Sequence, residues 1–247
     1  MNETIKQLFE RKSVRVFTDE IIRQEDKELI LQSAIQAPTA GNQSMYTILD
    51  ITDKELLKKL SVTCDNQPFI ATAPLALVFC ADYQKWYDTF KIVKEDIREP
   101  QAGDLILSIN DALIAAQNAV VAAESLGIGS CYIGDIMENC EEVRELLNLE
   151  EYVFPAAFLV FGYPNDQQKD RAKPQRFTIS QIVCENTYKR KSAEELKEMF
   201  IERGNRQENG TYDFEKRMKA FCDFKYESDF SKEMSRSVRE YMKAYMK

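Results

Sequence analysis

One segment constrains the fold of this chain more than any other: the 24 residues from 104 to 127, DLILSINDALIAAQNAVVAAESLG. Its apolar residues recur every three or four positions among many alanines, which predicts a long helix packed closely on most sides. Gly127 is well suited to end that helix, because glycine readily adopts the left-handed conformation that follows a helix C-terminus. We therefore expect a fold built around one buried central helix.

The other segments predict strands and helices in layers. Apolar runs of strand length occupy 45–52, 75–82 and 156–164, and helical patterns occupy 2–10, 25–36, 53–60 and 137–147. The stretch APTAGNQ (37–43) has the composition of a turn. Strands that alternate with helices in this way predict an α/β or α+β fold.

The domain organisation follows from the absence of repeats and from a change in charge. We expect one compact core over residues 1–190, with a lid insertion at 83–103, and a charged helical extension over 191–247. The insertion holds the only tryptophan, Trp86, which either covers the site or packs on the surface. The extension carries a narrow apolar stripe that packs on the core or on a partner subunit: Phe230, Met234, Val238, Tyr241 and Tyr245.

Composition excludes several functions. The chain has no histidine, which removes Ser-His-Asp and Cys-His nucleophiles and two-histidine metal motifs. Its 33 basic and 41 acidic residues give a net charge of −8, which argues against binding to nucleic acid or to anionic membranes. The start of the chain lacks a signal-peptide pattern, and no uninterrupted apolar stretch reaches about 18 residues, so we expect a cytoplasmic protein.

The six cysteines are scattered, with no CxxC spacing. Most lie in apolar runs, so we expect buried reduced thiols rather than a metal site or disulfides. The residues concerned are Cys64, Cys80, Cys131, Cys140, Cys184 and Cys222.

A basic segment near the N-terminus could bind an anion. Arg11, Lys12, Ser13 and Arg15 place two guanidinium groups, an ammonium group and a hydroxyl within five residues, enough to hold a phosphate. An exposed basic turn is the alternative. A second cluster, Lys173 to Arg176, could converge on the same anion.

Neutral polar residues form a second group. Thr39, Asn42, Gln43 and Gln67 offer amide and hydroxyl groups that both donate and accept, as a flat heterocycle with mixed edges requires. Turn formation is the alternative for these residues. GIGSCY (127–132) lacks the third glycine of a dinucleotide-binding fingerprint, and neither a P-loop nor a GxSxG motif is present.

Four segments taken together resemble the nitroreductase superfamily, in the branch of NADPH-dependent oxygen-insensitive nitroreductases and flavin reductases. They occur in the expected order within residues 5–190: RKSVRVFTDE (11–20), APTAGNQ (37–43), AAESLGIGSCYIGD (122–135) and AKPQRFTISQIVCENTY (172–188). The resemblance implies an α+β fold with a central, mostly antiparallel sheet flanked by helices. It also implies a long buried helix at the core of an intertwined homodimer, with two FMN molecules at the interface.

The resemblance implies a ping-pong reaction in which NAD(P)H reduces flavin N5, and a nitroaromatic, a quinone or free flavin is then reduced. No catalytic acid or base and no metal are required, since water can supply protons. It assigns Arg11 and Ser13 to the FMN phosphate and ribityl chain, and Arg15 to the N1 and C2 carbonyl edge. Further contacts fall to Thr39, Asn42, Gln43, Gln67, Tyr132, Ile133, Gly134, Asp135, Lys173 and Arg176.

Three positions depart from the family pattern. Arg11 replaces a residue that is often histidine, which should preserve phosphate binding. Asp135 replaces a second glycine, and either repels anionic acceptors or caps the next helix; we favour the cap. Arg203 lies in the loop that should bind the NADPH 2′-phosphate, but Glu202 and Glu208 lie close by in sequence, so the preference between NADH and NADPH stays open.

Two other functions remain open. A narrower reductase of flavin, disulfides or metal ions would share the same cofactor site. A flavin-binding sensor or delivery protein would use the charged C-terminal extension to contact a partner.

Overall fold

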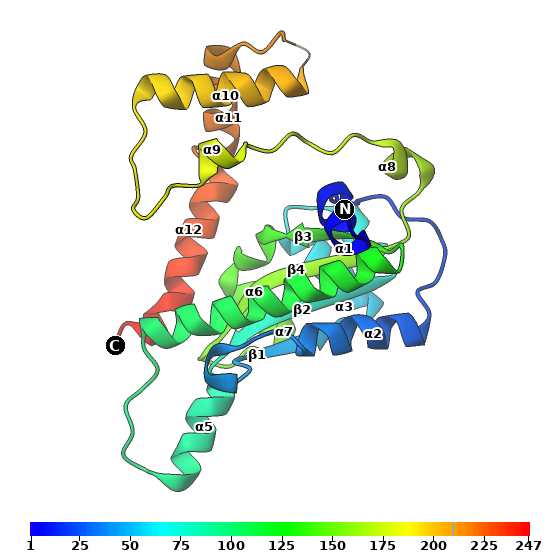
Figure 1. Ribbon diagram of the computed structural model, residues 1–247. Helices are drawn as coiled ribbons and strands as arrows, with labels where there is room; N and C mark the ends of the chain where they lie inside the picture. Colours follow the sequence, from blue (N-terminus) through cyan, green and yellow to red (C-terminus); the bar gives the residue numbers. More distant parts are fainter. Residues whose placement is uncertain (209) are drawn as a thin grey trace. The chain divides into compact units, whose positions relative to one another are not determined.

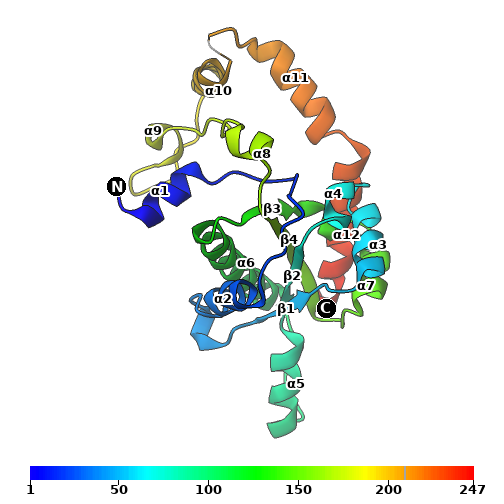
Figure 2. The ribbon, with the colours of Figure 1, turned by 90° about the vertical axis from the view of Figure 1, so that its right-hand side faces the viewer.

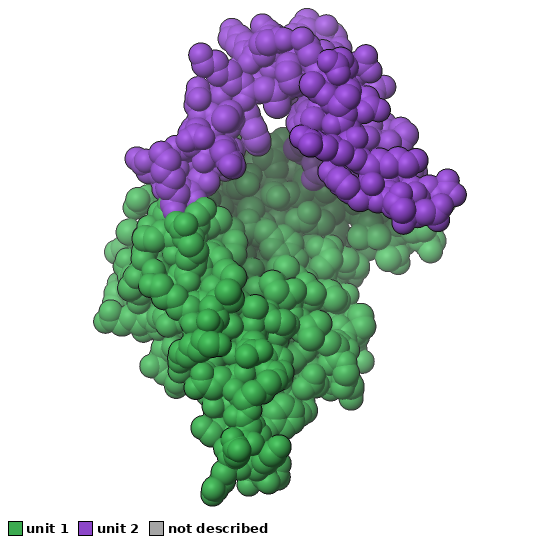
Figure 3. All heavy atoms as spheres, turned by 90° about the vertical axis from the view of Figure 1, so that its left-hand side faces the viewer, with its two compact units in different colours: residues 1–171, 233–247 green, residues 172–232 purple. Residues whose placement is uncertain are grey.

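Four antiparallel strands form the sheet on which the structure is built (Figure 1). The computed structural model describes residues 1–208 and 210–247. These residues form two compact units, coloured green and purple in Figure 3: residues 1–171 with 233–247, and residues 172–232. The second unit begins at residue 172, whereas the sequence predicted a boundary at residue 191. The predicted roles of these parts, a cofactor-binding core and a charged extension, stay predictions.

The first unit contains the sheet and the helices that flank it. Its elements are α1 (Glu3–Glu10), α2 (Gln24–Ile35), η1 (Ala40–Asn42), β1 (Tyr46–Asp50), α3 (Lys54–Thr63), α4 (Pro68–Ala71), β2 (Leu75–Asp82), α5 (Gln84–Val93), α6 (Ala102–Ser125), β3 (Gly129–Ile133), η2 (Gly134–Met137), α7 (Cys140–Leu147), β4 (Val153–Gly162) and α8 (Asp166–Asp170). The strand order is β1-β2-β4-β3. The expected α+β fold with an antiparallel sheet and a long central helix is confirmed.

The sheet buries both faces, because its two middle strands are apolar at almost every position. In β2, Leu77 and Phe79 point to the cluster that contains α6, whereas Val78 and Cys80 point to the opposite cluster. Helices α2 and α6 cover one face and α3 and α7 the other, as Figure 2 shows. Successive side chains of a strand point to opposite faces of the sheet, so a strand that is apolar at every position is buried on both faces.

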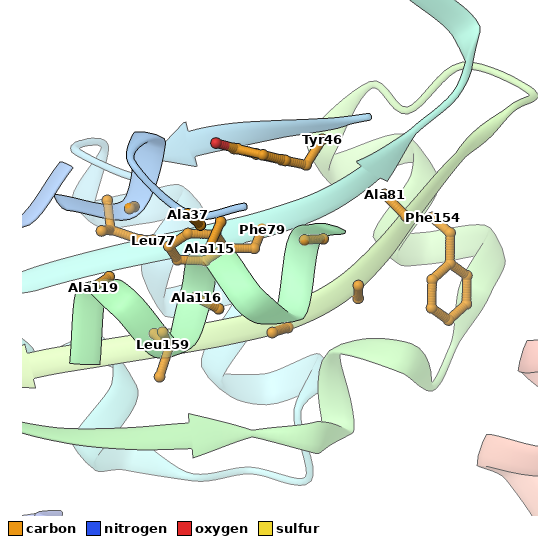
Figure 4. Packing of buried hydrophobic residues seen from close by; sticks show 14 of the residues in the cluster. Ala37, Tyr46, Leu77, Phe79, Ala81, Ala115, Ala116, Ala119, Phe154 and Leu159 are labelled. Carbon is orange, nitrogen blue, oxygen red and sulfur yellow. The ribbon is translucent and has the colours of Figure 1, made fainter. Parts of the chain in front are cut away.

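Helix α6 packs closely because its buried face consists mainly of alanine. Ala112, Ala115, Ala116 and Ala119 are fully buried in the same cluster as the strand residues Leu77 and Phe79. Figure 4 shows the last three of these alanines against the sheet. Small side chains let the helix backbone approach the strands, so this face tolerates little added volume. By length and composition alone α6 could cross a membrane, but this packing makes it the core helix of the fold.

The ends of α6 follow from local sequence. Gln101 and Asp104 form a reciprocal capping box at the N-terminus, and Arg98 pairs with Asp104 at 2.5 Å. Gly127 has φ +74° just beyond the C-terminus, as expected for a residue that ends a helix.

Two elements differ from the sequence prediction. Strand β3 was not predicted, because five residues that include glycine and serine carry little strand signal of their own. The helix expected over 137–147 begins only at Cys140, because η2 and the left-handed Asn139 (φ 48°) precede it.

The last helix, α12 (Asp229–Met242), ends in η3 (Lys243–Tyr245). Tyr241 and Tyr245 are buried in the core of the first unit, with Val238 packed against it, whereas packing of the extension on a partner subunit stays a prediction. Phe230 instead contacts Phe224 in the second unit, with ring centroids 6.3 Å apart.

The second unit is helical. It contains α9 (Ile179–Ile182), α10 (Ala193–Gln207) and α11 (Phe214–Lys225). Phe200 joins them through edge-on contacts with Phe177 and Phe214. Gly204 is a glycine for steric reasons, since a Cβ there would lie 2.2 Å from the Tyr212 ring.

Gly162 should be intolerant of any side chain. A Cβ on this residue would lie 2.6 Å from the Phe17 ring and 2.9 Å from Pro74, and neither ring can move freely. Gly162→Ala should therefore destabilise the protein by about 1–3 kcal/mol, measured by urea unfolding. Gly103→Ala is the matched control: its Cβ meets nothing within 4 Å, so this helical position should be neutral or slightly stabilised. Equal effects of the two substitutions would contradict this packing.

Candidate functional site

The basic segment 11–15 is held along the exposed edge of strand β3. The Val14 amide donates to the Ser130 carbonyl at 2.9 Å, and Ser13 bridges Ser130 in parallel register. The Val14 side chain fills the space beside Gly129, where a Cβ would lie 2.6 Å from it. The missing side chain at Gly129 therefore lets the segment dock on the strand.

Docking brings positive charge to β3. Burial raises the pKa of the Cys131 thiol, while Arg15, Ser13 and Arg11 oppose that rise, which places these three side chains near Cys131. Burial also raises the pKa of Tyr132 to about 12, and Arg11 again opposes it. The predicted residues Arg11, Ser13 and Arg15 thus lie together near Cys131, and Arg11 also lies near Tyr132.

Arg11 has an unmet hydrogen-bonding need. Its Nε atom is buried and has no hydrogen-bond partner among the residues that the structure describes. An unpaired guanidinium N–H out of contact with solvent is unfavourable, and an anion at this position would satisfy it. The geometry therefore favours an anion site over an exposed basic turn.

Lys12 is engaged differently from its neighbours. Its ammonium group donates to the backbone carbonyls of Lys169 and Arg171, and Arg171 donates in turn to the carbonyl of Ser13. These contacts join the basic segment to the end of the first unit. A cofactor contact for Lys12 stays a prediction.

The polar loop 39–45 is clamped by a buried carboxylate that the sequence analysis did not single out. Asp111 of α6 is only 2% exposed and accepts from the Ala40 amide at 2.9 Å and from the Met45 amide at 3.1 Å. The loop needs such support, because Gly41, Asn42 and Ser44 have positive φ. An acidic residue among the alanines and other small residues of this helix face was the available signal.

Trp86 supports the same loop. Its indole N–H donates to the Gln43 carbonyl at 2.8 Å, and its ring packs against Phe90. The tryptophan of the predicted lid therefore anchors α5 to the loop that carries Thr39, Asn42 and Gln43. Thr39 also contributes by accepting from the Ser44 amide at 3.2 Å.

Gln67 and Asp135 meet beside Gly134. The Gln67 side-chain amide donates to the Cys64 carbonyl and to the Asp135 carboxylate, each at 2.8 Å. The expectation that Asp135 caps the next helix is wrong: Asn139 occupies the N-cap of α7, and Ile133 that of η2. Gly134 is exposed, and a Cβ there would meet nothing within 4 Å, so the space beside this contact is open.

Glu138 lies behind this contact in an acidic environment. It is 4% exposed, and its Oε1 atom has no hydrogen-bond partner among the described residues. Burial, followed by the charges of Asp135, Asp65 and Glu233, raises its pKa to about 7.

The second unit carries the remaining predicted residues. Lys173 and Arg176 lie before α9, and Arg206 donates to the Arg176 carbonyl at 2.9 Å. Arg203 stacks on Phe177, with its guanidinium carbon 4.0 Å from the ring centroid. Convergence of these residues with the N-terminal cluster stays a prediction.

The acidic neighbours of Arg203 have partners of their own. Glu208 pairs with Arg217 at 2.8 Å, and Glu202 accepts from Gln181 at 2.5 Å.

Four cysteines are buried and two, Cys184 and Cys222, are exposed; all six are free thiols. Burial was therefore predicted correctly for the cysteines in apolar runs. Among the described residues, no group of three or more acidic or cysteine side chains is arranged to hold a metal ion.

Comparison with known proteins gives consistent matches. The model of the nitroreductase family matches residues 8–163. An FMN reductase [NAD(P)H] of Bacillus subtilis is 37% identical over 194 residues, which cover 76% of this chain and 75% of the relative. An oxygen-insensitive NADPH nitroreductase of Salmonella typhimurium is 33% identical over 219 residues, which cover 86% of this chain and 88% of the relative.

A solved structure supports the same grouping. The structure of the hypothetical oxidoreductase YcnD from Bacillus subtilis matches with a TM-score of 0.80 and 31% identity, and covers 98% of each chain. The likeness therefore extends over both compact units.

Substitution of Glu138 should change stability in a pH-dependent way. A glutamate ordinarily has a pKa of 4.5, so between about pH 4.5 and 7 folded Glu138 keeps a proton that the unfolded chain has released. The free energy of unfolding must therefore fall as pH rises through that window. Above it, the whole cost of the ionised, buried Glu138 carboxylate remains. Glu138→Gln should thus stabilise the protein more at pH 8 than at pH 5, measured by urea unfolding.

The control for this experiment is Glu142→Gln, at an exposed position on α7. Its effect should be small at both pH values. An equal effect of Glu138→Gln at pH 5 and pH 8 would contradict the assigned environment.

Proposed function

The chain belongs to the nitroreductase family and is an FMN-dependent NAD(P)H oxidoreductase, and we propose that its flavin phosphate binds at the basic segment 11–15. The observation that carries this proposal is the buried Nε of Arg11, which has no hydrogen-bond partner among the described residues and lies near Ser13 and Arg15. A phosphate would accept charge-assisted hydrogen bonds from these groups. Because the chain as a whole carries a net charge of −8, this local group of cations stands out as a place where an anion could bind.

The residues fit the other parts of FMN as well. Arg15 would lie at the N1 and C2 carbonyl edge, where reduction places negative charge, so a fixed cation there stabilises the reduced cofactor. The clamped loop and β3 would supply the remaining contacts of the first unit, from Thr39, Asn42, Gln43, Gln67, Tyr132, Ile133 and Gly134. Contacts of Lys173 and Arg176 with the same phosphate stay a prediction.

FMN bound here would supply hydride-accepting chemistry, so that the nicotinamide could leave in its oxidised form before an oxidised acceptor entered the same site. The chain's own residues bind and orient, and none has to act as a general acid or base. Asp111 and Trp86 hold the loop in place, and the exposed Gly134 leaves room for a flat ligand. Solvent supplies protons, which agrees with a chain that has no histidine.

Arg203 is the proposed contact for the nicotinamide cofactor. Stacking on Phe177 fixes the guanidinium plane and leaves its N–H edges available for a phosphate, such as the 2′-phosphate of NADPH. The nearby carboxylates of Glu202 and Glu208 are engaged with Gln181 and Arg217, which leaves Arg203 to act on a ligand. This supports NADPH over NADH.

We also propose a homodimer. Helix α6 exposes large apolar side chains on the face opposite its alanines: Ile106, Leu107, Leu113 and Ile114. Helix α1 adds Leu8 and Phe9, both exposed. A patch of this kind is unfavourable in water, and a second copy of the chain would cover it. A cytoplasmic location stays a prediction.

The acceptor is proposed as a nitroaromatic, a quinone or free flavin. These acceptors are flat and electron-poor, and the open space at Gly134 suits such shapes.

The experiment uses full-length protein loaded with FMN. It should be yellow, sediment as a dimer, and oxidise NADPH when a nitroaromatic, quinone or flavin is added. Arg11→Ala should weaken FMN binding by about 1–3 kcal/mol, measured by quenching of flavin fluorescence, because it removes charged hydrogen bonds to the phosphate. Lys6→Ala, which removes an exposed charge from α1, should leave the affinity unchanged.

A colourless protein that takes up no FMN would contradict the proposed function. Equal FMN affinity of Arg11→Ala and Lys6→Ala would contradict the phosphate assignment alone.

A further inference from the structure

The side-chain amide of Gln67 has both of its N–H bonds committed within the protein. One partner is the Cys64 carbonyl and the other is the Asp135 carboxylate, each 2.8 Å from Nε2. A carbonyl can only accept, and an ionised carboxylate can only accept. The chemistry of the partners therefore fixes which end of the amide faces them, and only Oε1 remains for a ligand.

The backbone around Gln67 is fixed as well. The backbone N–H of Gln67 donates to the Ser61 carbonyl at 2.9 Å, and Gln67 precedes Pro68, the first residue of α4. Asp65 and Asn66 before it both adopt left-handed conformations that end α3. A side chain held by two hydrogen bonds on a backbone segment that is itself fixed has little freedom to rotate.

We propose that Asp135 is a positioning residue that turns the Gln67 amide so that only its oxygen faces the cofactor. The proposal rests on the flavin site proposed above. The pyrimidine edge of oxidised isoalloxazine has several acceptors but a single N–H, at N3. Gln67 held in this way accepts from N3–H, and its donors are withheld from the flavin carbonyls.

The charged groups near Asp135 leave the Gln67 amide as its partner. Glu138 lies close to Asp135, and Asp65 and Glu233 lie close to Glu138, so these neighbours are carboxyl groups that offer no cation. Arg236, the cation next to Glu233, is shared between Glu233 and Glu141 at 2.8 Å each. The Cys64 thiol also faces Asp135, and burial with the nearby carboxylates raises its pKa to about 12, so it stays neutral.

The open space at Gly134 lies directly before Asp135 in the chain. Since a Cβ on Gly134 would meet nothing within 4 Å, a flat ligand can approach this turn while Asp135 points to Gln67. Gly134 and Asp135 thus have different roles: Gly134 leaves room for the ligand, and Asp135 orients the Gln67 amide.

The experiment compares the binding of FMN and of N3-methyl-FMN, which lacks the N3–H, by fluorescence titration. Four full-length proteins are used: wild type, Asp135→Ala, Asp135→Asn and Gln67→Ala. Wild type should bind FMN about 2- to 12-fold more tightly than the methylated analogue, the range of one hydrogen bond. Gln67→Ala should lose this discrimination.

Asp135→Ala should also lower the discrimination, because the freed amide can offer its N–H groups. Asp135→Asn keeps an acceptor oxygen for Gln67 and should retain the wild-type ratio. A merely structural role of Asp135 would weaken both ligands equally and leave the ratio unchanged, which would overturn the proposal. Wild-type discrimination no greater than that of Gln67→Ala would overturn it too, while tight FMN binding would leave the proposed function standing. Absence of FMN binding by wild type would instead remove the flavin site itself.

Discussion

The close packing of helix α6 on the sheet is the constraint on which the rest of the structure depends. Its alanines let the helix lie near β2 and β4, and this closeness brings Asp111 within reach of the loop between α2 and β1. The buried carboxylate needs hydrogen bonds, and the loop needs an acceptor for the backbone amides of Ala40 and Met45 near its two ends. One helix face therefore serves as the core and fixes a loop of the proposed flavin site.

A second set of contacts fixes the charged part of the site at the sheet edge. Gly129 and Gly162 leave room for Val14 and Phe17, and the N-terminal segment fills the space that side chains would have taken. Arg11 and the rest of the basic segment are thereby held on β3. Room left by the missing side chains in two strands, rather than a long loop, positions the cations of the proposed anion site in a chain that is acidic as a whole.

The sequence predicted the main helices and the long strands, because their periodicity and length are local properties. It identified the basic and polar segments as site candidates, but it gave Trp86 no partner and missed Asp111, since both act through residues far apart in the chain. Asp135 was assigned to a helix cap because local spacing favoured one. Its actual partner, Gln67, is 68 residues away, and no local pattern records that contact.

The central claim is that a phosphate group is bound at the Arg11 segment. The most direct test is to titrate the wild-type apoprotein with FMN and with riboflavin, which differ only in that phosphate. Two or more charge-assisted hydrogen bonds should make FMN bind at least about tenfold more tightly, with the difference decreasing as salt is added. Equal affinity for the two flavins would contradict the claim.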